Sequence, residues 1–277
     1  MIDLDVLARD AARLDPLPTS VARLASLIGA GDPPFDEIIE LVRFDQAMTA
    51  SLLRTANSSW SASRSEVATV KDAVIRLGAG PVLSLAIAAH VQAQMTRAVP
   101  ELGLGEHDLW DHSVAAMLAA EMLGRAATHR PPPETATAAL LHDVGKLIMA
   151  RHLDPPLLAA LAASETAGHS RMQAERDVLG VTHAELGGLI AQSWGLPETL
   201  ARGIRLHHEP DPRDGAIACA VHLADLIATA VAAGAGVDDA GLRFDFALGQ
   251  LGLTPAAVEE TGRLVAERLV EVQDRLR

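Results

Sequence analysis

The stretch Ala138–Met149, AALLHDVGKLIM, constrains the fold more than any other part of the chain. Wound as a helix at about 100° per residue, it puts its aliphatic side chains on one arc and His142, Asp143 and Lys146 on the opposite arc. An imidazole, a carboxylate and an ammonium on an otherwise apolar helix are costly to bury unless each finds a partner, and a metal ion with a phosphate would supply those partners. This polar arc therefore predicts either one wall of a metal and phosphate site or an ordinary solvated helix face, and the other histidines decide between the two.

The rest of the chain has the amino-acid composition of a helical protein, with proline and glycine where helices would end. Hydrophobic residues make up 49% of the sequence, aromatic residues only 3%, and there is no tyrosine. Alanine and leucine favour helix, whereas the β-branched and aromatic runs of strands are scarce. Proline and glycine divide the helical patterns into short segments, as at Pro16–Pro18 and Gly29–Pro34. We expect an all-α fold, a multi-helix bundle with short connections.

The chain length and one linker suggest a division into three parts. A chain of 277 residues can form one large domain or two smaller ones. The segment Ala98–His107 carries Pro100, Gly103 and Gly105 and marks a boundary. We expect an N-terminal helical part over residues 1–97, a helical core with a candidate metal site over 98–233, and a helical extension over 234–277, which is suited to packing or homodimer contact.

Net charge, cysteine content and the apolar runs indicate which ligands and which cellular location to expect. The formal net charge of −13 argues against nucleic-acid binding, which needs clustered Lys and Arg, whereas a local metal would still permit a phosphate-bearing ligand. The single cysteine, Cys219, excludes an internal disulfide and is expected to be buried. The N-terminus lacks the pattern of a signal peptide, and apolar runs such as Val82–Ala89 are too short to cross a bilayer. We expect a cytoplasmic protein that does not contact membranes.

Seven imidazoles and carboxylates are spread over five predicted helices, an arrangement that suits a metal held inside a bundle. They are His112, His142, Asp143, His183, His207, His208 and Asp225. Nitrogen and oxygen donors without a thiolate are compatible with Zn²⁺, Fe, Mn²⁺ or Mg²⁺. Four of them would hold one ion, and the others would complete a pair of ions about 4 Å apart.

Each of these residues also has a structural interpretation. His142 and Asp143 would form a hydrogen-bonded pair, His183 would be a helix-start residue of the capping box Thr182–Glu185, and His208 would be a surface neighbour of His207. The remaining histidines and the tryptophans are interpreted as structural, surface or core residues: His90, His107, His129, His152, His169, His222, Trp60, Trp110 and Trp194.

The segment Leu14–Val91 resembles the N-terminal part of the HDOD family, helical bacterial signalling modules related to the HD phosphohydrolases. The likeness rests on the PLP turn at Pro16–Pro18, on Asp45 ahead of LLRTANS with its Asn57 and Ser58, and on RLGAGPV at Arg76–Val82. It extends to about Val231 and therefore covers most of the chain. It implies an HD-like helical core preceded by a helical N-terminal part.

The order His112, His142-Asp143, Asp225 resembles the HD superfamily, whose phosphohydrolases bind divalent metals at these positions. His183 and His207-His208 resemble the additional ligands of the two-metal HD enzymes that cleave cyclic dinucleotides. The resemblance implies a metal-bound water as nucleophile beside Asp143 and a phosphate contact from Lys146. After Glu209, however, the chain reads PDPRDG and lacks the Gly-Tyr-Pro element of those phosphodiesterases, so their substrate is not carried over.

We therefore expect a signal-transduction module of the HDOD type that binds one or two divalent metal ions and a nucleotide and acts through a partner protein in trans. The alternative is an active metal-dependent phosphohydrolase or phosphodiesterase, which retention of the full ligand set favours. Whether the chain is an enzyme stays open at this point.

Overall fold

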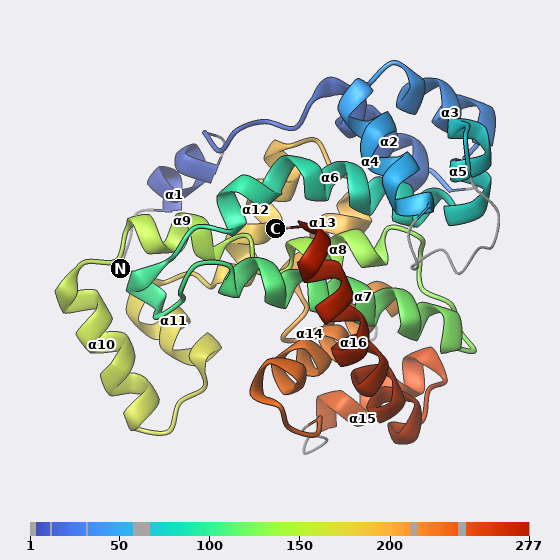
Figure 1. Cartoon of the computed structure of the whole chain (residues 1–277). Helices are drawn as coiled ribbons and strands as arrows, with labels where there is room; N and C mark the ends of the chain where they lie inside the picture. The colour runs from blue at the N-terminus through green and yellow to red at the C-terminus, as the bar shows by residue number, and fades with distance from the viewer. Residues whose placement is uncertain are drawn as a thin grey trace.

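The computed structural model describes residues 4–11, 13–31, 33–57, 67–211, 215–237 and 242–276. In these residues the chain is built of helices, and the one β feature is an isolated bridge between Val99 and Leu104 (Figure 1). The predicted all-α class is confirmed. Ser58 and Trp60, with most of the polar connection expected between Asn57 and Thr69, lie outside the described residues.

The N-terminal helices form a compact group at one end of the molecule (Figure 1). They are α2 (Thr19–Gly29), α3 (Phe35–Arg43), α4 (Gln46–Ala56), α5 (Val70–Leu77) and α6 (Ala79–Met95). Two residues singled out in the sequence shape their connections. Asp45 caps α4 by accepting a hydrogen bond from the Met48 N–H at 3.0 Å. The Asn57 side chain bonds both the N–H and the carbonyl of Val67, at 2.7 and 2.8 Å, and so closes the loop after α4.

The first helix lies apart from this group. α1 (Leu4–Ala11) packs on α9 (Lys146–Arg151) and α12 (His183–Ser193). His152, just after α9, holds α1 through a hydrogen bond between its Nε2 and Asp10 Oδ2 at 2.8 Å. The start of the chain therefore packs on the elements that carry the candidate site.

The centre of the molecule is formed by α7 (Asp108–Ala126), α8 (Thr135–Leu141) and α14 (Gly215–Ala233), which all contact one another. Their small side chains let the helices approach closely, and Cys219, Trp110 and the alanines of α7 are buried there. α13 (Glu198–Arg205) covers α8 and α14, while α10 (Pro155–Thr166) and α11 (Arg171–Leu179) form a pair at the edge (Figure 1).

The N-terminal group is joined to this centre through α6 and α8. Ser84 Oγ and Thr137 Oγ1 share a buried hydrogen bond at 2.9 Å. Gly80 lies so close to the chain before α8 that an added Cβ would be 2.3 Å from the Pro133 carbonyl oxygen. The expected boundary at 98–107 contains the 3₁₀ turn η2 (Pro100–Leu102), and the three-part division stays a prediction.

The C-terminal helices α15 (Leu242–Leu251) and α16 (Pro255–Leu276) pack on α14, and α16 also contacts α7. Among the described residues, α14 is the one helix long and apolar enough to cross a membrane, and α5 with α6 passes the same test as a pair bent by 110°. In α14, 61% of the apolar window is buried inside the protein, as in the core helix of a soluble fold.

Candidate metal centre

The seven predicted site residues come together at one place although they lie on different elements. His112 is on α7, His142 and Asp143 follow α8, and Asp225 is on α14. His183 is the first residue of α12, and His207 and His208 follow α13. Their ligand atoms form overlapping groups in which all members lie within 4.8 Å of one another. We call these seven residues the His/Asp cluster.

The expected continuous helix over 138–149 is wrong in one respect. α8 ends at Leu141, a turn follows over 142–145, and α9 begins at Lys146. In and just after this turn, backbone N–H groups bond the carbonyl three residues earlier, as in a 3₁₀ helix. Val144 N–H, for example, donates to the Leu141 carbonyl at 3.0 Å. The same chain segment approaches the start of α12, where a Cβ on Gly145 would be 1.9 Å from the His183 carbonyl oxygen. Only glycine fits there, so this contact brings α12 and its histidine to His142 and Asp143.

Helix α13 ends at Arg205, before the two neighbouring histidines. His207 and His208 therefore lie in a turn. Consecutive residues of a regular helix point about 100° apart, whereas this turn brings the two imidazole centroids to 4.0 Å. Both rings thus contribute to one site.

One side of the cluster is formed by His112, His142 and Asp225. The Nε2 atoms of the two histidines are 3.1 Å apart, and Asp225 Oδ1 lies 3.1 Å from His112 Nε2 and 3.4 Å from His142 Nε2. Three donor atoms from three separate elements therefore face one small volume.

The other side is formed by His183, His207 and His208. His183 Nε2 lies 3.0 Å from His208 Nε2. The ligand atoms of all three histidines lie within 4.8 Å of one another. Asp143 lies between the two sides. Its Oδ1 is 3.2 Å from His183 Nε2, while its Oδ2 is 3.5 Å from His142 Nε2. One carboxylate thus presents one oxygen to each side.

Hydrogen bonds behind the rings fix which nitrogen faces the cluster. His142 Nδ1 donates to the Ala139 carbonyl at 2.7 Å, and His207 Nδ1 donates to the Ile204 carbonyl at 2.6 Å. With Nδ1 occupied, each ring turns its Nε2 inward as an acceptor. This pattern is typical of metal-ligating histidines.

Glu175, on α11, is a site residue that the sequence reasoning missed. Its Oε2 accepts hydrogen bonds from His183 Nδ1 at 2.8 Å and from His183 N–H at 2.9 Å, and its Oε1 accepts from Arg171 Nε at 3.0 Å. The side chain is fully buried. Glu175 therefore fixes the orientation of the His183 ring by holding its Nδ1, which leaves Nε2 facing the cluster. Nothing in the charged helix pattern of α11 distinguished it.

The electrostatics of the carboxylates favour their ionised form. Burial raises the pKa of Asp143, but the Lys146 ammonium and the imidazoles around it outweigh burial and hold this pKa well below its usual range. Burial likewise raises the pKa of Asp225, and the neighbouring imidazoles of His112 and His142 lower it further than burial raises it. Both carboxylates are therefore anionic and suited to a cation.

Two of the histidines are held in the neutral form that binds metal. Burial and the neighbouring His208 imidazole hold the pKa of His207 well below its usual range. Burial and the His183 imidazole lower the pKa of His208 to about 4. His142 differs, because the carboxylates of Asp143 and Asp225 outweigh burial and raise its pKa.

The hydrogen bonding of one buried atom, His207 Nε2, bears directly on whether the residues fit a metal ion. His207 is fully buried, and among the described residues its Nε2 has no hydrogen-bond partner. An acceptor nitrogen left unpaired in the interior costs free energy, and a metal ion would use its lone pair. The nitrogen and oxygen donor set, the anionic carboxylates and this unpaired nitrogen all fit a divalent cation.

Lys146 lies at the edge of the cluster. Its Nζ is 2.6 Å from Asp143 Oδ2, and its side chain is 25% exposed, whereas that of Asp143 is 3% exposed. The ammonium is therefore positioned between the buried carboxylate and solvent, where it can meet an incoming anion.

The other histidines stay outside the cluster, as expected. His222 donates from Nδ1 to the His207 carbonyl at 2.8 Å and so supports the turn after α13. His90 packs edge-on against Trp194, with ring centroids 6.4 Å apart. His169 is exposed and bonds Ser164. These contacts are structural.

The comparisons with known proteins agree with this architecture. The chain is 25% identical over 211 residues to an uncharacterized protein of Treponema pallidum (strain Nichols). That match covers 72% of this chain and 39% of the relative, so the chain spans about two fifths of the length of the curated relative it matches.

Two solved structures match nearly the whole chain. One, from Shewanella amazonensis SB2B, is provisionally named a phosphohydrolase; it is 25% identical, has a TM-score of 0.65, and the match covers 95% of this chain and 97% of that one. The other is an HDOD domain protein of unknown function from Geobacter sulfurreducens, 24% identical, with a TM-score of 0.69 and coverage of 99% and 98%. The family model described as the HDOD domain matches residues 14–210, which include six of the seven cluster residues and leave out Asp225. The chain belongs to the HDOD family.

Proposed function

We propose that this HDOD protein is a metal-binding signalling module, in which the His/Asp cluster holds one or two divalent cations. The observation that carries the proposal is the convergence of seven nitrogen and oxygen donors on one place, with the buried Nε2 of His207 lacking any hydrogen bond in the described structure. His112, His142 and Asp225 would hold one ion, His183, His207 and His208 would hold the other, and Asp143 has an oxygen toward each.

The ion would supply positive charge in a buried site that is rich in acceptor atoms. The donor set is compatible with Fe, Mn²⁺, Zn²⁺ or Mg²⁺. Binding would join α7, α12, α14 and the turns after α8 and α13, because each contributes at least one donor. Metal occupancy would therefore change how firmly these elements are held together.

Action through a partner in trans is part of the same proposal, as are a nucleotide ligand, a cytoplasmic location and self-association. Large apolar side chains exposed on the N-terminal helices support a protein contact. Phe35 on α3 is 46% exposed, Phe44 just after α3 is 90% exposed, and Ile75 on the neighbouring α5 is 58% exposed. Exposed apolar groups of this kind favour contact with another macromolecule.

Hydrogen exchange with and without Mn²⁺ tests the signalling proposal. We expect added Mn²⁺ to slow exchange in the turns after α8 and α13 and in the helices that carry cluster residues, and we expect no such change in Asp143→Ala. Equal exchange of the wild-type protein with and without the metal would contradict the proposal.

An active phosphohydrolase or phosphodiesterase is the second candidate. Lys146 favours it, because its partly exposed ammonium lies 2.6 Å from Asp143 Oδ2 and can bind a phosphate oxygen beside the cluster. Turnover of cyclic or hyperphosphorylated nucleotides with added Mn²⁺ would support this candidate if His142→Ala and Asp143→Ala abolished it while the protein stayed folded. Absence of turnover across such substrates, in protein shown to retain metal, would leave the signalling module alone.

A further inference from the structure

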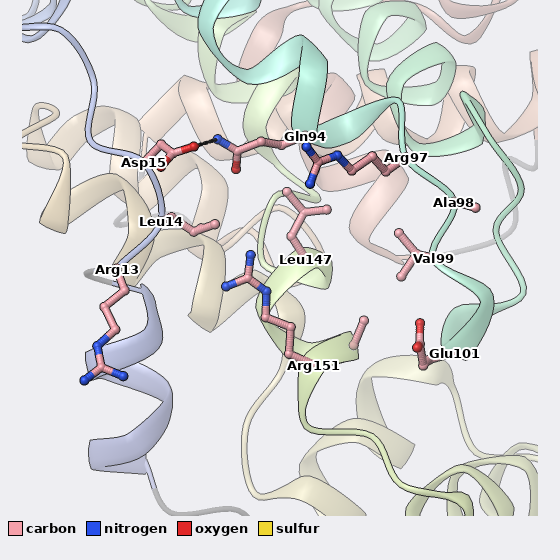
Figure 2. Close-up of a pocket in the computed structure, with 11 residues that line it drawn as sticks. Arg13, Leu14, Asp15, Gln94, Arg97, Ala98, Val99, Glu101, Leu147 and Arg151 are labelled. Atoms are coloured by element: carbon pink, nitrogen blue, oxygen red, sulfur yellow. Dashed lines mark hydrogen bonds between the residues drawn. The ribbon is translucent and has the colours of Figure 1, made fainter.

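A hollow separate from the His/Asp cluster lies between the chain after α1, the end of α6 and the outer side of α9 (Figure 2). Its volume is about 310 Å³, which is within the range of small-molecule sites. The α9 side chains Leu147, Ala150 and Arg151 form one wall. Gln94 and Arg97 from the end of α6 lie across from them.

Two guanidinium groups converge on this hollow. Figure 2 shows those of Arg97 and Arg151 directed toward the space beside Leu147, whereas that of Arg13 points away. Arg13 is ion-paired with Asp10 at 3.5 Å. Within the described part of the chain, the side chains of Arg97 and Arg151 form no hydrogen bond or ion pair. Two guanidiniums that face one space and have no carboxylate partner can together bind an anion from solution.

The other polar groups of the hollow indicate what the anion carries. The Asp15 carboxylate accepts a hydrogen bond from Gln94 Nε2 at 3.3 Å, and Glu101 adds a second carboxylate to the lining. These oxygens repel a second anionic group but accept hydrogen bonds from hydroxyl or amino groups. Leu14, Val99 and Leu147 supply apolar contact area. The lining thus matches a molecule with one compact anionic end and a neutral, hydrogen-bonding body.

We infer that this hollow binds a small phosphomonoester, the class that includes nucleoside monophosphates and sugar phosphates, with its phosphate held between Arg97 and Arg151. A phosphate accepts bidentate hydrogen bonds from guanidinium groups, and the hydroxyl groups of the same molecule reach Asp15 or Glu101. The hollow and the His/Asp cluster both border α9. Lys146 at its start pairs with Asp143, and Arg151 at its end lies about 7.5 Å further along the helix axis at 1.5 Å per residue.

Calorimetric titration of the full chain with adenosine 5′-monophosphate, ribose 5-phosphate and inorganic phosphate tests the inference. We expect saturable binding of the two esters and weaker binding of inorganic phosphate. Because each arginine makes charged hydrogen bonds, Arg97→Gln and Arg151→Gln should each weaken ester binding about tenfold. Both side chains are exposed, so neither change should affect folding.

Arg54→Gln is the matched control. It removes the same charge from an exposed position on α4 that does not line the hollow, and it should leave the affinity unchanged. Adenosine monophosphate binding more tightly than ribose 5-phosphate would add a base contact to the site, and equal binding would show that the sugar phosphate suffices; both results support the inference.

Chelator treatment separates this site from the metal centre. The ester should bind chelator-treated and Mn²⁺-loaded protein equally, whatever the cluster holds. Three results would overturn the inference: no binding of either ester, ester binding that both arginine variants leave unchanged, or ester binding that chelator removes. An inorganic phosphate affinity equal to that of the esters would also overturn it, because the body of the ligand would then contribute nothing.

Discussion

His207→Leu should change thermal stability little in the absence of metal and remove most of the stabilisation that metal gives. Without metal, His207 is a neutral, fully buried imidazole whose Nε2 has no hydrogen bond in the described structure and whose Nδ1 bonds the Ile204 carbonyl. Leucine removes an unpaired buried acceptor, which costs about 1–3 kcal/mol, and loses one hydrogen bond worth about 0.5–1.5 kcal/mol. These effects nearly cancel. The melting temperature in chelator should therefore stay close to that of the wild type.

With metal, the same substitution should remove most of the stabilisation. A ligand present at about 100 times its Kd stabilises the folded state by about 2.7 kcal/mol, which is about 5–10 °C in melting temperature for a chain of this size. Losing a direct ligand weakens metal binding by on the order of 100-fold. This is the upper end of the range for mutations of residues that hydrogen-bond to metal ligands. At the same metal concentration the variant would then gain only about 0.4 kcal/mol, or about 1 °C.

Thermal melts followed by circular dichroism, in chelator and in Mn²⁺, measure both effects. His169→Gln, at an exposed histidine outside the cluster, is the control and should keep the full metal shift. Two results would refute the reasoning: a metal shift in His207→Leu equal to that of the wild type, or a variant that melts many degrees lower in chelator.

Three further changes probe the support of the site. Glu175→Gln removes the charge that orients His183 and should weaken Mn²⁺ affinity about 10- to 100-fold by titration; an unchanged affinity would exclude this orienting role. Gly145→Ala places a Cβ 1.9 Å from the His183 carbonyl oxygen and should lower the free energy of unfolding by about 1–3 kcal/mol or more in urea, whereas a neutral effect would mean that the approach is not needed. His208 has a folded pKa of about 4 against an ordinary value of 6.5, so the unfolded chain binds more protons between these values, and metal-free stability should fall as pH drops from 6.5 to 4. His208→Gln should flatten that part of the stability curve relative to His169→Gln, and equal slopes would contradict the assignment.

Most of the helices could be predicted because their signals are local. Alanine and leucine at helical spacing favour helix in α4 and α5, and Gly78 ends α5. The capping box at Thr182–Glu185 correctly marked the start of α12. The turn after α8 could not be predicted in this way, because residues 142–145 have ordinary helical spacing. It depends on the close approach of α12 to Gly145, a contact between segments nearly 40 residues apart.

The cluster residues could be proposed because histidine and aspartate stand out on apolar helices, and the structure brings all seven together. Their roles as metal ligands stay predictions. Glu175 could not be found, since a glutamate among charged residues of a helix gives no sign that it will be buried against a histidine of the next helix. The arginine-lined hollow was missed for a related reason: Arg97 and Arg151 meet only after α6 and α9 have packed around the start of the chain.

Metal content decides whether the His/Asp cluster is a metal centre. Wild-type protein and the double variant His142→Ala/Asp143→Ala would be dialysed in separate samples against Fe²⁺, Mn²⁺ and Zn²⁺, desalted and analysed by inductively coupled plasma mass spectrometry. A cooperative melt would confirm that the variant is folded. We predict at least one retained ion per wild-type chain and none in the variant. Equal metal content in the two proteins, or none in the wild type across Fe, Mn²⁺ and Zn²⁺, would show that these side chains converge for a structural reason alone.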